Sequence, residues 1–209
     1  MSIPTATLLR RAGVHLLDTD HERWKVDELI DWINEGARAI VSRRYDAGSS
    51  TENVALVAGS KQTLAADVFR LIDITRNRGT GNDAGRVVKR VDRQLLDVSD
   101  PLWHSKTAAA ITRQYVYDEK FNPSVFYVSP PAISGNYLEA IVSRFPAEVT
   151  SADGQEVNLT DEFQEPLLNF ILYRCYAKDS EYGDPSKAVA HYQAFTAALG
   201  APQNGGQQQ

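Results

Sequence analysis

The side chains that most often bind metals are few and scattered in this 209-residue chain. No two of its four histidines have the HxH or HxxxH spacing that places two imidazoles on one metal ion; they are His15, His21, His104 and His191. One cysteine cannot supply the further ligands of a zinc site. We therefore expect no metal site and no cofactor.

The single cysteine, Cys175, is the one candidate for a nucleophile, with a distant histidine as its base. It falls within an apolar stretch of expected helix, where a thiol usually serves as packing material. No pair of acid and base residues stands out at the end of an expected strand or in a glycine-flanked turn. We expect that the chain is not an enzyme.

The glycine-rich segment 79–85 is the remaining place where chemistry could occur, because such loops can bind phosphate. It lacks the Gly-Lys-Ser/Thr ending of a P-loop and precedes an expected strand, so a hairpin loop is favoured. The basic residues that flank it are Arg76, Arg78, Arg86, Lys89, Arg90 and Arg93. Because Asp73, Asp83 and Asp92 are interleaved and no aromatic residue stacks among them, we favour a solvated hairpin or a subunit contact over DNA contact.

The acidic residues are unevenly distributed along the chain. The segment from residue 151 onward has three basic and eight acidic residues, so it accounts for the whole net charge of −5. Proteins that grip duplex DNA need clustered Lys and Arg, so tight general DNA binding is disfavoured. An acidic surface could instead repel phosphates and let a strand slide past.

No apolar run approaches the roughly 20 residues that span a bilayer. The N-terminus also lacks the charged-then-apolar order of a signal peptide. We expect neither secretion nor a membrane partner.

Helical patterns mark both ends of the chain. Residues 25–44 place their apolar side chains at three- and four-residue steps, and residues 5–17 show a shorter pattern of the same kind. The polar residues 18–20 between them could end one helix and cap the next. Two N-terminal helices are expected.

The C-terminal region predicts two further helices. Pro166 is tolerated only in a first helical turn, so one helix should begin near Glu165. Asp184 and Pro185 fit the N-cap and first position of the next helix, and Gly200 fits its end.

Between these helical regions the hydrophobic period changes to two. The short β-branched and aromatic runs are residues 54–58, 69–75, 86–91, 111–117, 124–128 and 137–144. Residues 97–101 and 129–131 have turn composition and are expected to be loops.

The expected fold class is α+β, with a helical bundle made from the N- and C-terminal helices and a central antiparallel β-rich insertion. The expected organisation is residues 1–50 for the N-terminal helices, 51–150 for the β-rich insertion, 151–200 for the C-terminal helical hairpin and 201–209 for a flexible tail.

Several segments, in their order along the chain, resemble adaptor proteins of tailed bacteriophages. They are residues 115–131 (YVYDEKFNPSVFYVSPP), 145–149 (FPAEV), 172–180 (LYRCYAKDS) and 190–195 (AHYQAF), with Arg23-Trp24, Glu28-Leu29 and 34–36 in the first long helix. The resemblance covers nearly the whole chain, is weakest over residues 78–100, and lies in the order of the segments rather than in any single one.

The resemblance implies a structural virion protein that acts as a head-to-tail adaptor. Its copies would form a ring, commonly a dodecamer, that joins the portal protein to the tail or nozzle protein. Genomic DNA would pass through the ring without tight sequence-specific binding. Such a protein would be assembled in the host cytoplasm and would lie at the head-tail junction of the virion.

Two other functions stay open. The alternative is a DNA-binding or packaging accessory factor that acts through the basic hairpin around residues 76–93. The third and least favoured is a small enzyme such as a tail-associated hydrolase.

Two sets of residues are candidate interfaces within this adaptor interpretation. The polar tail would order on meeting the portal, and its residues are Ala201, Pro202, Gln203, Asn204, Gly205, Gly206, Gln207, Gln208 and Gln209. Trp32 lies off the apolar stripe of its helix, so it could be either a core or an interface residue. The candidate contacts with neighbouring or tail subunits are Trp32, Arg78, Asn82, Asp83 and Arg86.

Overall fold

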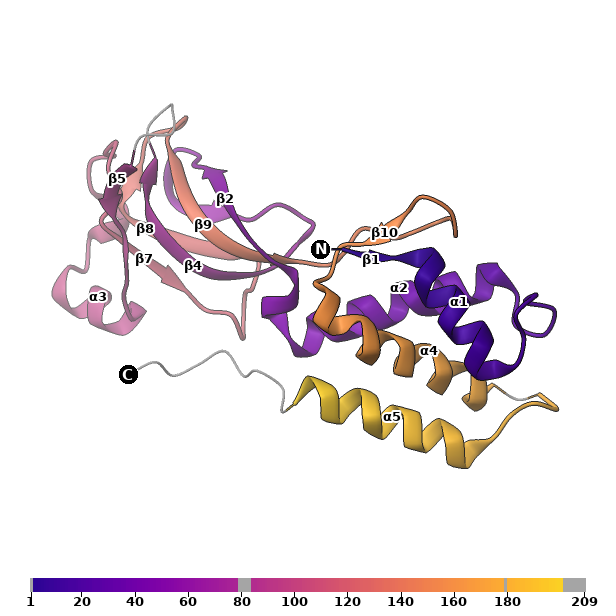
Figure 1. The fold of residues 1–209 in the computed structure, drawn as a ribbon. Coiled ribbons are helices and arrows are strands. Elements are labelled where there is room, and N and C mark those ends of the chain that lie inside the picture. The colour runs from indigo at the N-terminus through magenta and orange to yellow at the C-terminus, as the bar shows by residue number, and fades with distance from the viewer. Residues whose placement is uncertain (1, 79–83, 179, 201–209) are drawn as a thin grey trace. The chain divides into compact units, whose positions relative to one another are not determined.

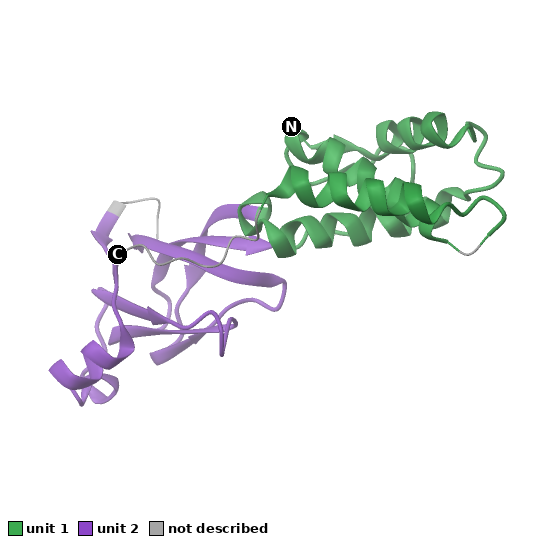
Figure 2. Ribbon diagram, turned by 90° about the horizontal axis from the view of Figure 1, so that it is seen from below, with its two compact units in different colours: residues 1–48, 145–209 green, residues 49–144 purple. Residues whose placement is uncertain are grey.

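The chain folds into two units, each with its own secondary structure. The structure is a computed structural model and describes residues 2–78, 84–178 and 180–200. Residues 1–48 and 145–209 form the helical unit, and residues 49–144 form the β unit (Figure 2). Helices and largely antiparallel strands make up the chain, which confirms the predicted α+β class.

The helical unit is a bundle in which helices from both ends of the chain pack together (Figure 1). Its helices are α1 (Thr5–Leu16), α2 (Val26–Arg43), α4 (Gln164–Ala177) and α5 (Pro185–Leu199). Helix α4 packs against each of the other three, and its side chains are buried on most sides. The predicted bundle of N- and C-terminal helices is therefore confirmed.

The boundaries of α5 follow from its capping residues. The Asp184 carboxylate accepts hydrogen bonds from the backbone N–H groups of Ser186 and Lys187 at 3.0 and 3.1 Å. Pro185 occupies the first helical position, where its missing N–H costs nothing, and Gly200 ends the helix with φ 70°. Both predicted boundaries are confirmed.

The turn between α1 and α2 is organised by Asp18. Its buried carboxylate accepts hydrogen bonds from the backbone N–H groups of Glu22, Arg23 and Trp24 at 2.9–3.1 Å. Burial alone would raise the pKa of Asp18, but these three hydrogen bonds lower it below its usual value. The prediction that residues 18–20 cap α2 is wrong. Asp18 binds the backbone of the turn before α2, and the N-cap residue of α2 is Lys25, whose side chain makes no capping hydrogen bond.

Very short elements complete the helical unit and carry no sequence signal of their own. Strand β1 (Ile3–Pro4) pairs antiparallel with β10 (Glu156–Val157). The 3-10 turns are η1 (Tyr45–Gly48) and η3 (Asp161–Phe163).

The β unit contains two four-stranded sheets. One has the order β2-β9-β4-β5, formed by Ser49–Ala55, Tyr137–Arg144, Val68–Arg78 and Ala84–Val87. The other has the order β3-β8-β7-β6, formed by Gly59–Thr63, Val125–Ala132, Gln114–Tyr117 and Lys89–Arg90. The pairs are antiparallel except for β6 with β7, and both sheets contribute to one core that includes Leu71, Ile74, Tyr115, Phe126, Val128, Leu138 and Val142.

Two expected loops in the β unit are wrong. Residues 129–131 continue β8, since the carbonyls of Ser129 and Pro131 accept hydrogen bonds from Arg113 and Ala109. The missing proline N–H groups fall where the register with β3 shifts, so no ladder bond is lost. Residues 97–99 belong to the short helix α3 (Arg93–Ser99), because Asp92 caps its N-terminus through Gln94 and Leu95. A 3-10 turn, η2 (Trp103–Ser105), follows.

Candidate functional site

Cys175 is a core residue. Its side chain is fully buried in α4, and burial raises the pKa of the thiol, so the reactive thiolate is strongly disfavoured. Among the residues that the structure describes, no group of three or more His, Cys, Asp and Glu side chains could hold a metal ion.

Two of the four histidines, His104 and His191, make well-defined local contacts. His104 lies stacked on Trp103, with ring centroids 3.5 Å apart, and its Nδ1 lies 2.8 Å from the Ser60 hydroxyl. His191 stacks on Tyr176 of α4, and its Nδ1 lies 2.9 Å from the Asn169 side-chain oxygen. These contacts suit packing between elements of one unit.

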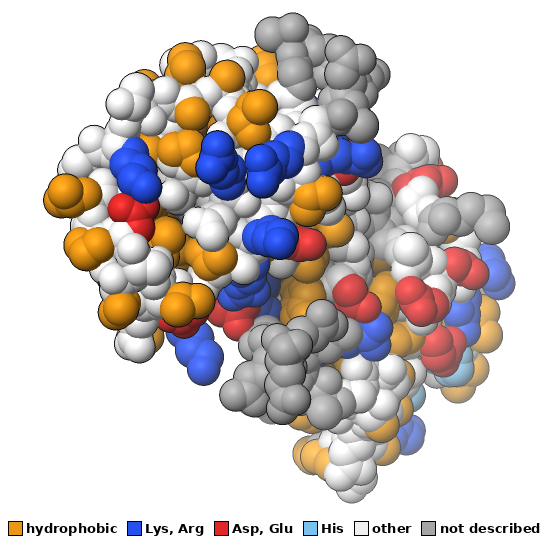
Figure 3. All heavy atoms as spheres, turned by 90° about the vertical axis from the view of Figure 1, so that its left-hand side faces the viewer, with side chains coloured by type: hydrophobic (Ala, Val, Ile, Leu, Met, Phe, Trp, Pro, Cys, Tyr) orange, Lys and Arg blue, Asp and Glu red, His pale blue; other side chains and the backbone are white. Residues whose placement is uncertain are grey.

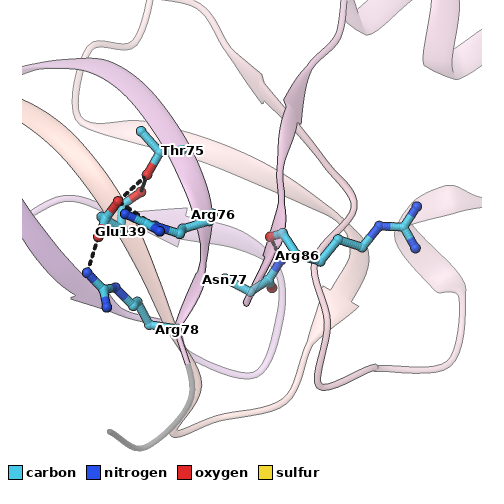
Figure 4. A network of polar contacts seen from close by, with 6 residues as sticks. All are labelled: Thr75, Arg76, Asn77, Arg78, Arg86 and Glu139. Atoms are coloured by element: carbon cyan, nitrogen blue, oxygen red, sulfur yellow. Dashed lines mark hydrogen bonds and ion pairs between the residues drawn. The ribbon is translucent and has the colours of Figure 1, made fainter. Parts of the chain in front are cut away.

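Glu139 binds the arginines at the end of β4 (Figure 4). One carboxylate oxygen accepts hydrogen bonds from Arg76 Nε at 2.8 Å and Thr75 Oγ1 at 2.7 Å, and the other pairs with Arg78. The hydrogen bond from Arg76, then those from Thr75 and Arg78, lower the pKa of Glu139 to about 2. Two of the six basic residues that flank the glycine loop therefore share one carboxylate from a neighbouring strand.

Asn77 joins β5 to β4 and to the segment before β7. Its side chain is buried and donates to the carbonyls of Arg86 and Thr112, each at 2.8 Å, while its oxygen accepts from the Thr112 N–H at 2.8 Å. Gly85 allows this approach, because a Cβ there would lie 2.6 Å from the Asn77 carbonyl oxygen. One asparagine side chain thus ties the Arg86 carbonyl of β5 to the Thr112 backbone.

Three cationic side chains gather beside this anchored backbone in what we call the basic hollow. This open hollow of about 520 Å³ is lined by Arg86, Val87, Lys89, Arg113 and Gln114. Within the described part of the chain, the three cations form no ion pair, and Figure 4 shows the Arg86 side chain extending away from the Glu139 cluster. The hollow can accept an anionic group.

Helix α3 and the turn after it expose an apolar stripe. The side chains of Leu95, Val98 and Leu102 are 65%, 82% and 71% exposed, respectively. Figure 3 views the side of the molecule on which β5 and α3 lie, and shows hydrophobic side chains gathered there with Lys and Arg side chains among them. Exposed apolar side chains grouped with cations are typical of a protein contact surface.

The helical unit has a second candidate surface, a groove of about 760 Å³ along α4 and α5. Its lining includes Tyr173, Tyr176, Pro185, Val189 and Tyr192. The ring centroids of Tyr173 and Tyr192 lie 5.0 Å apart, so aromatic packing holds the two helices together beside the groove.

The candidate interface residues have different environments. Trp32 is buried at 8% exposure against Trp24, with ring centroids 6.1 Å apart, so its indole belongs to the core of the helical unit in this chain. Arg78 pairs with Glu139, whereas Arg86 is exposed in the basic hollow. Asn82, Asp83 and residues 201–209 lie outside the described residues, and the assignment of all these positions to interfaces stays a prediction.

Sequence reasoning missed two features of these surfaces. Arg113 lies far along the chain from the glycine loop, and only the parallel pairing of β6 with β7 brings it to Lys89. The stripe on α3 was hidden because residues 97–101 were expected to be a loop; the spacing of Leu95, Val98 and Leu102 was the available signal.

Within the described residues, no helix has both the length and the apolar character needed to cross a membrane.

Comparison with known proteins gives one informative result. No protein of curated function matches the sequence. The family model described as SU10 adaptor protein matches residues 4–209, which is nearly the whole chain and includes both units. A match of that extent agrees with the resemblance noted in the sequence, and the chain belongs to the SU10 adaptor protein family, a family of structural adaptors of bacteriophage particles.

Proposed function

We propose that this structural virion protein is a head-to-tail adaptor whose copies form a ring, with a dodecamer as the expected form. The ring joins the portal protein to the tail or nozzle protein at the head-tail junction, after assembly in the host cytoplasm. Genomic DNA passes through its lumen, and the protein has no enzymatic role.

The observation that carries this proposal is the family match over residues 4–209. The distribution of exposed groups supports it. A closed ring is built from heterologous contacts, so each subunit needs two different surfaces. The β unit offers the basic hollow and the α3 stripe, and the helical unit offers the groove along α4 and α5.

The direct test is the mass of the particles that the full chain forms with and without the purified portal protein of the same phage. Mass photometry and electron microscopy should show a ring of uniform copy number bound to the portal. Portal particles whose mass does not change on adding the chain would refute the adaptor function.

The tail is the proposed portal contact. The motivation is its polar composition directly after a helix that ends at Gly200. Deleting residues 201–209 should abolish co-sedimentation with the portal. Replacing them with a Gly-Ser segment of equal length then tests whether the sequence of the tail or only its length is needed for binding. Undiminished co-sedimentation of the deletion would refute this contact.

The lumen that faces DNA is proposed to be neutral or acidic, since the chain carries a net charge of −5. A reconstruction of the assembled ring would check this. A lumen dominated by Lys and Arg would contradict it.

The alternative of a DNA-binding accessory factor is less well supported. Arg76 and Arg78 bind Glu139, and Arg93 lies 3.5 Å from Asp97, so half of the basic residues proposed for DNA contact already face carboxylates. Salt-sensitive retention of the isolated chain on duplex DNA would favour the alternative, whereas the adaptor function predicts little retention.

A further inference from the structure

We propose that the basic hollow of one copy binds an acidic surface on the helical unit of a neighbouring copy of this chain. The acidic surface consists of Asp20, Glu22, Asp27 and Asp31, at the end of the α1–α2 turn and in the first turns of α2. This inference rests on the proposed ring, for which it supplies one of the subunit contacts.

The three cations of the hollow have no carboxylate partner among the described residues, because the described carboxylates of the β unit are engaged elsewhere. Arg144 binds Glu52 and Asp67, and Arg70 binds Glu119. The other pairs are Arg76 and Arg78 with Glu139, Arg93 with Asp97 and Lys106 with Asp100. The remaining described carboxylates accept hydrogen bonds from Tyr115 (Asp73) or from backbone N–H groups (Asp92 and Asp118). No described carboxylate of the β unit is therefore left to pair with the cations of the hollow.

The hollow is also held in shape. Its backbone is fixed by hydrogen bonds from Lys89 N–H to the Arg113 carbonyl at 3.0 Å and from Arg113 N–H to the Ser129 carbonyl at 2.9 Å. The Asn77 side chain also holds the Arg86 backbone, by donating a hydrogen bond to its carbonyl. Three cations on one fixed framework lose less conformational freedom on binding a group of carboxylates than three on a mobile loop.

The acidic surface shows the complementary imbalance. Carboxylates of α2 that meet α4 are paired, since Glu28 binds Lys178 at 2.6 Å and Glu35 binds Arg174 at 3.1 Å. The four exposed carboxylates of the acidic surface form no ion pair with any residue that the structure describes. Asp27 and Asp31 stand one helical turn apart, where like charges repel, so external cations would relieve a repulsion that the single chain leaves in place.

Charge and chemistry favour a second copy over nucleic acid. The residues of the helical unit carry 10 Lys and Arg against 17 Asp and Glu, a net −7, while those of the β unit carry 12 against 10, a net +2. Because the two surfaces lie on different units, one molecule has both halves of a head-to-tail contact. Val87, 64% exposed within the hollow, adds apolar area that a protein surface can cover. Among its described lining residues there is no aromatic side chain on which a base could stack.

The test compares the full chain with two neutralised variants. The hollow variant is Arg86→Gln/Lys89→Gln, and the acidic variant is Asp27→Asn/Asp31→Asn. Matched controls remove the same charge from exposed side chains elsewhere on the same units, as Lys61→Gln/Lys120→Gln and Asp153→Asn/Asp161→Asn. Thermal melts should coincide for all five proteins, because every substituted side chain is exposed.

Sedimentation velocity at 20 and 300 mM salt, up to about 100 µM protein, then measures self-association. The wild-type chain should associate at low salt and dissociate at high salt. Each test variant should weaken association at least tenfold, and each control by less than about twofold. A mixture of the two test variants should form 1:1 pairs that grow no further, because each retains the surface that the other lacks.

Three results with the isolated chain would overturn the inference. The first is a wild-type chain that stays monomeric at low salt. The second is that the test variants and the controls weaken self-association equally. The third is that the hollow variant loses retention on duplex DNA while its self-association is unchanged. If the hollow variant still forms complete rings on the portal, this contact is refuted while the adaptor function stands. If wild-type pairs form through these surfaces but no ring forms on the portal, the adaptor function fails and the contact stands.

Discussion

Glu139 decides the charge of the β4–β5 region at the scale of single residues. One carboxylate binds Arg76, Thr75 and Arg78, and these contacts hold its pKa at about 2 in the folded chain. In an unfolded chain a glutamate titrates near its usual value of 4.5. The folded-state pKa is thus depressed, so the stabilisation is fully present above about pH 4.5 and is lost as pH falls towards 2.

Replacing Glu139 with Gln should therefore lower the stability of the β unit at neutral pH, because two arginines lose their carboxylate. It should also flatten the loss of stability between pH 5 and pH 2. Urea denaturation at several pH values measures both effects, with Glu148→Gln, an exposed glutamate on the helical unit, as the control. A variant with the wild-type acid slope would show that the Glu139 cluster does not control acid stability.

Asn77 acts on the same region through the backbone. Asn77→Ala removes three hydrogen bonds and leaves the Arg86 carbonyl and the Thr112 N–H and carbonyl without this partner, so we expect a loss of about 1–3 kcal/mol. Hydrogen exchange should show faster exchange of the Thr112 amide. Asn77→Asp keeps the acceptor and loses both donors, so it should retain the Thr112 amide protection; equal exchange in both variants would contradict this account.

At the scale of elements, α4 determines how the helical unit packs. It contacts α1, α2 and α5, and it packs tightly against Gly36 of α2, where a Cβ would lie 2.6 Å from Leu167 Cδ1 and 2.8 Å from Phe170 Cδ1. Glycine is needed there for space rather than for its backbone conformation. In the β unit, α3 is not buried in this way. Its apolar stripe is exposed and packs against none of the residues of this chain that the structure describes.

Gly36→Ala tests the close crossing of α2 and α4. Alanine gains about 1 kcal/mol of helix propensity, but overpacking in a filled core costs about 1–3 kcal/mol, so we expect a net loss of up to about 2 kcal/mol. Denaturation measures this loss. The Gly36→Ala/Leu167→Val double variant should recover part of it by making room for the new methyl group, whereas strictly additive losses would argue against a steric origin.

The α3 stripe should act in assembly and not in stability. Val98→Asp should change the free energy of unfolding by less than about 0.5 kcal/mol, because the side chain is 82% exposed. Under the proposed function it should reduce binding to the tail protein or to neighbouring copies, measured with purified components. Lys120→Asp serves as an exposed control on the same unit, and equal binding by both variants would exclude the stripe as a contact.

At the scale of the whole molecule, the β unit is an insertion whose two ends lie together. Ser49 pairs with Ser143 in the β2–β9 ladder, so the chain enters and leaves the unit at neighbouring points. Each unit also has its own core, which is the physical requirement for independent folding.

Residues 49–144 should therefore fold when expressed alone. We expect a cooperative thermal transition and dispersed amide resonances, and the complementary chain, with Gly48 joined to Phe145 by a short Gly-Ser linker, should remain helical. A non-cooperative melt of the excised β unit would show that the helical unit is needed for its folding.

Local signals in the sequence determined the four helices of the helical unit, the α+β class and the family. Pro166, Asp184 and Gly200 mark helix ends because their backbone and capping preferences act within one turn, and the 3.6-residue period reports which face is buried. The ordered segments that resemble phage adaptors led to the same family that the match over residues 4–209 shows.

Only the tertiary structure decided which charges remain available for binding. Arg78 pairs with Glu139 across 61 positions of sequence, and Arg113 reaches Lys89 through a parallel strand pair, so neither fate can be read from neighbours in the chain. Short strands such as β3 and β10, which were not among the predicted strands, depend on their partners more than on composition. Long-range pairing thus divided the basic residues of this segment between a cluster around Glu139 and the basic hollow.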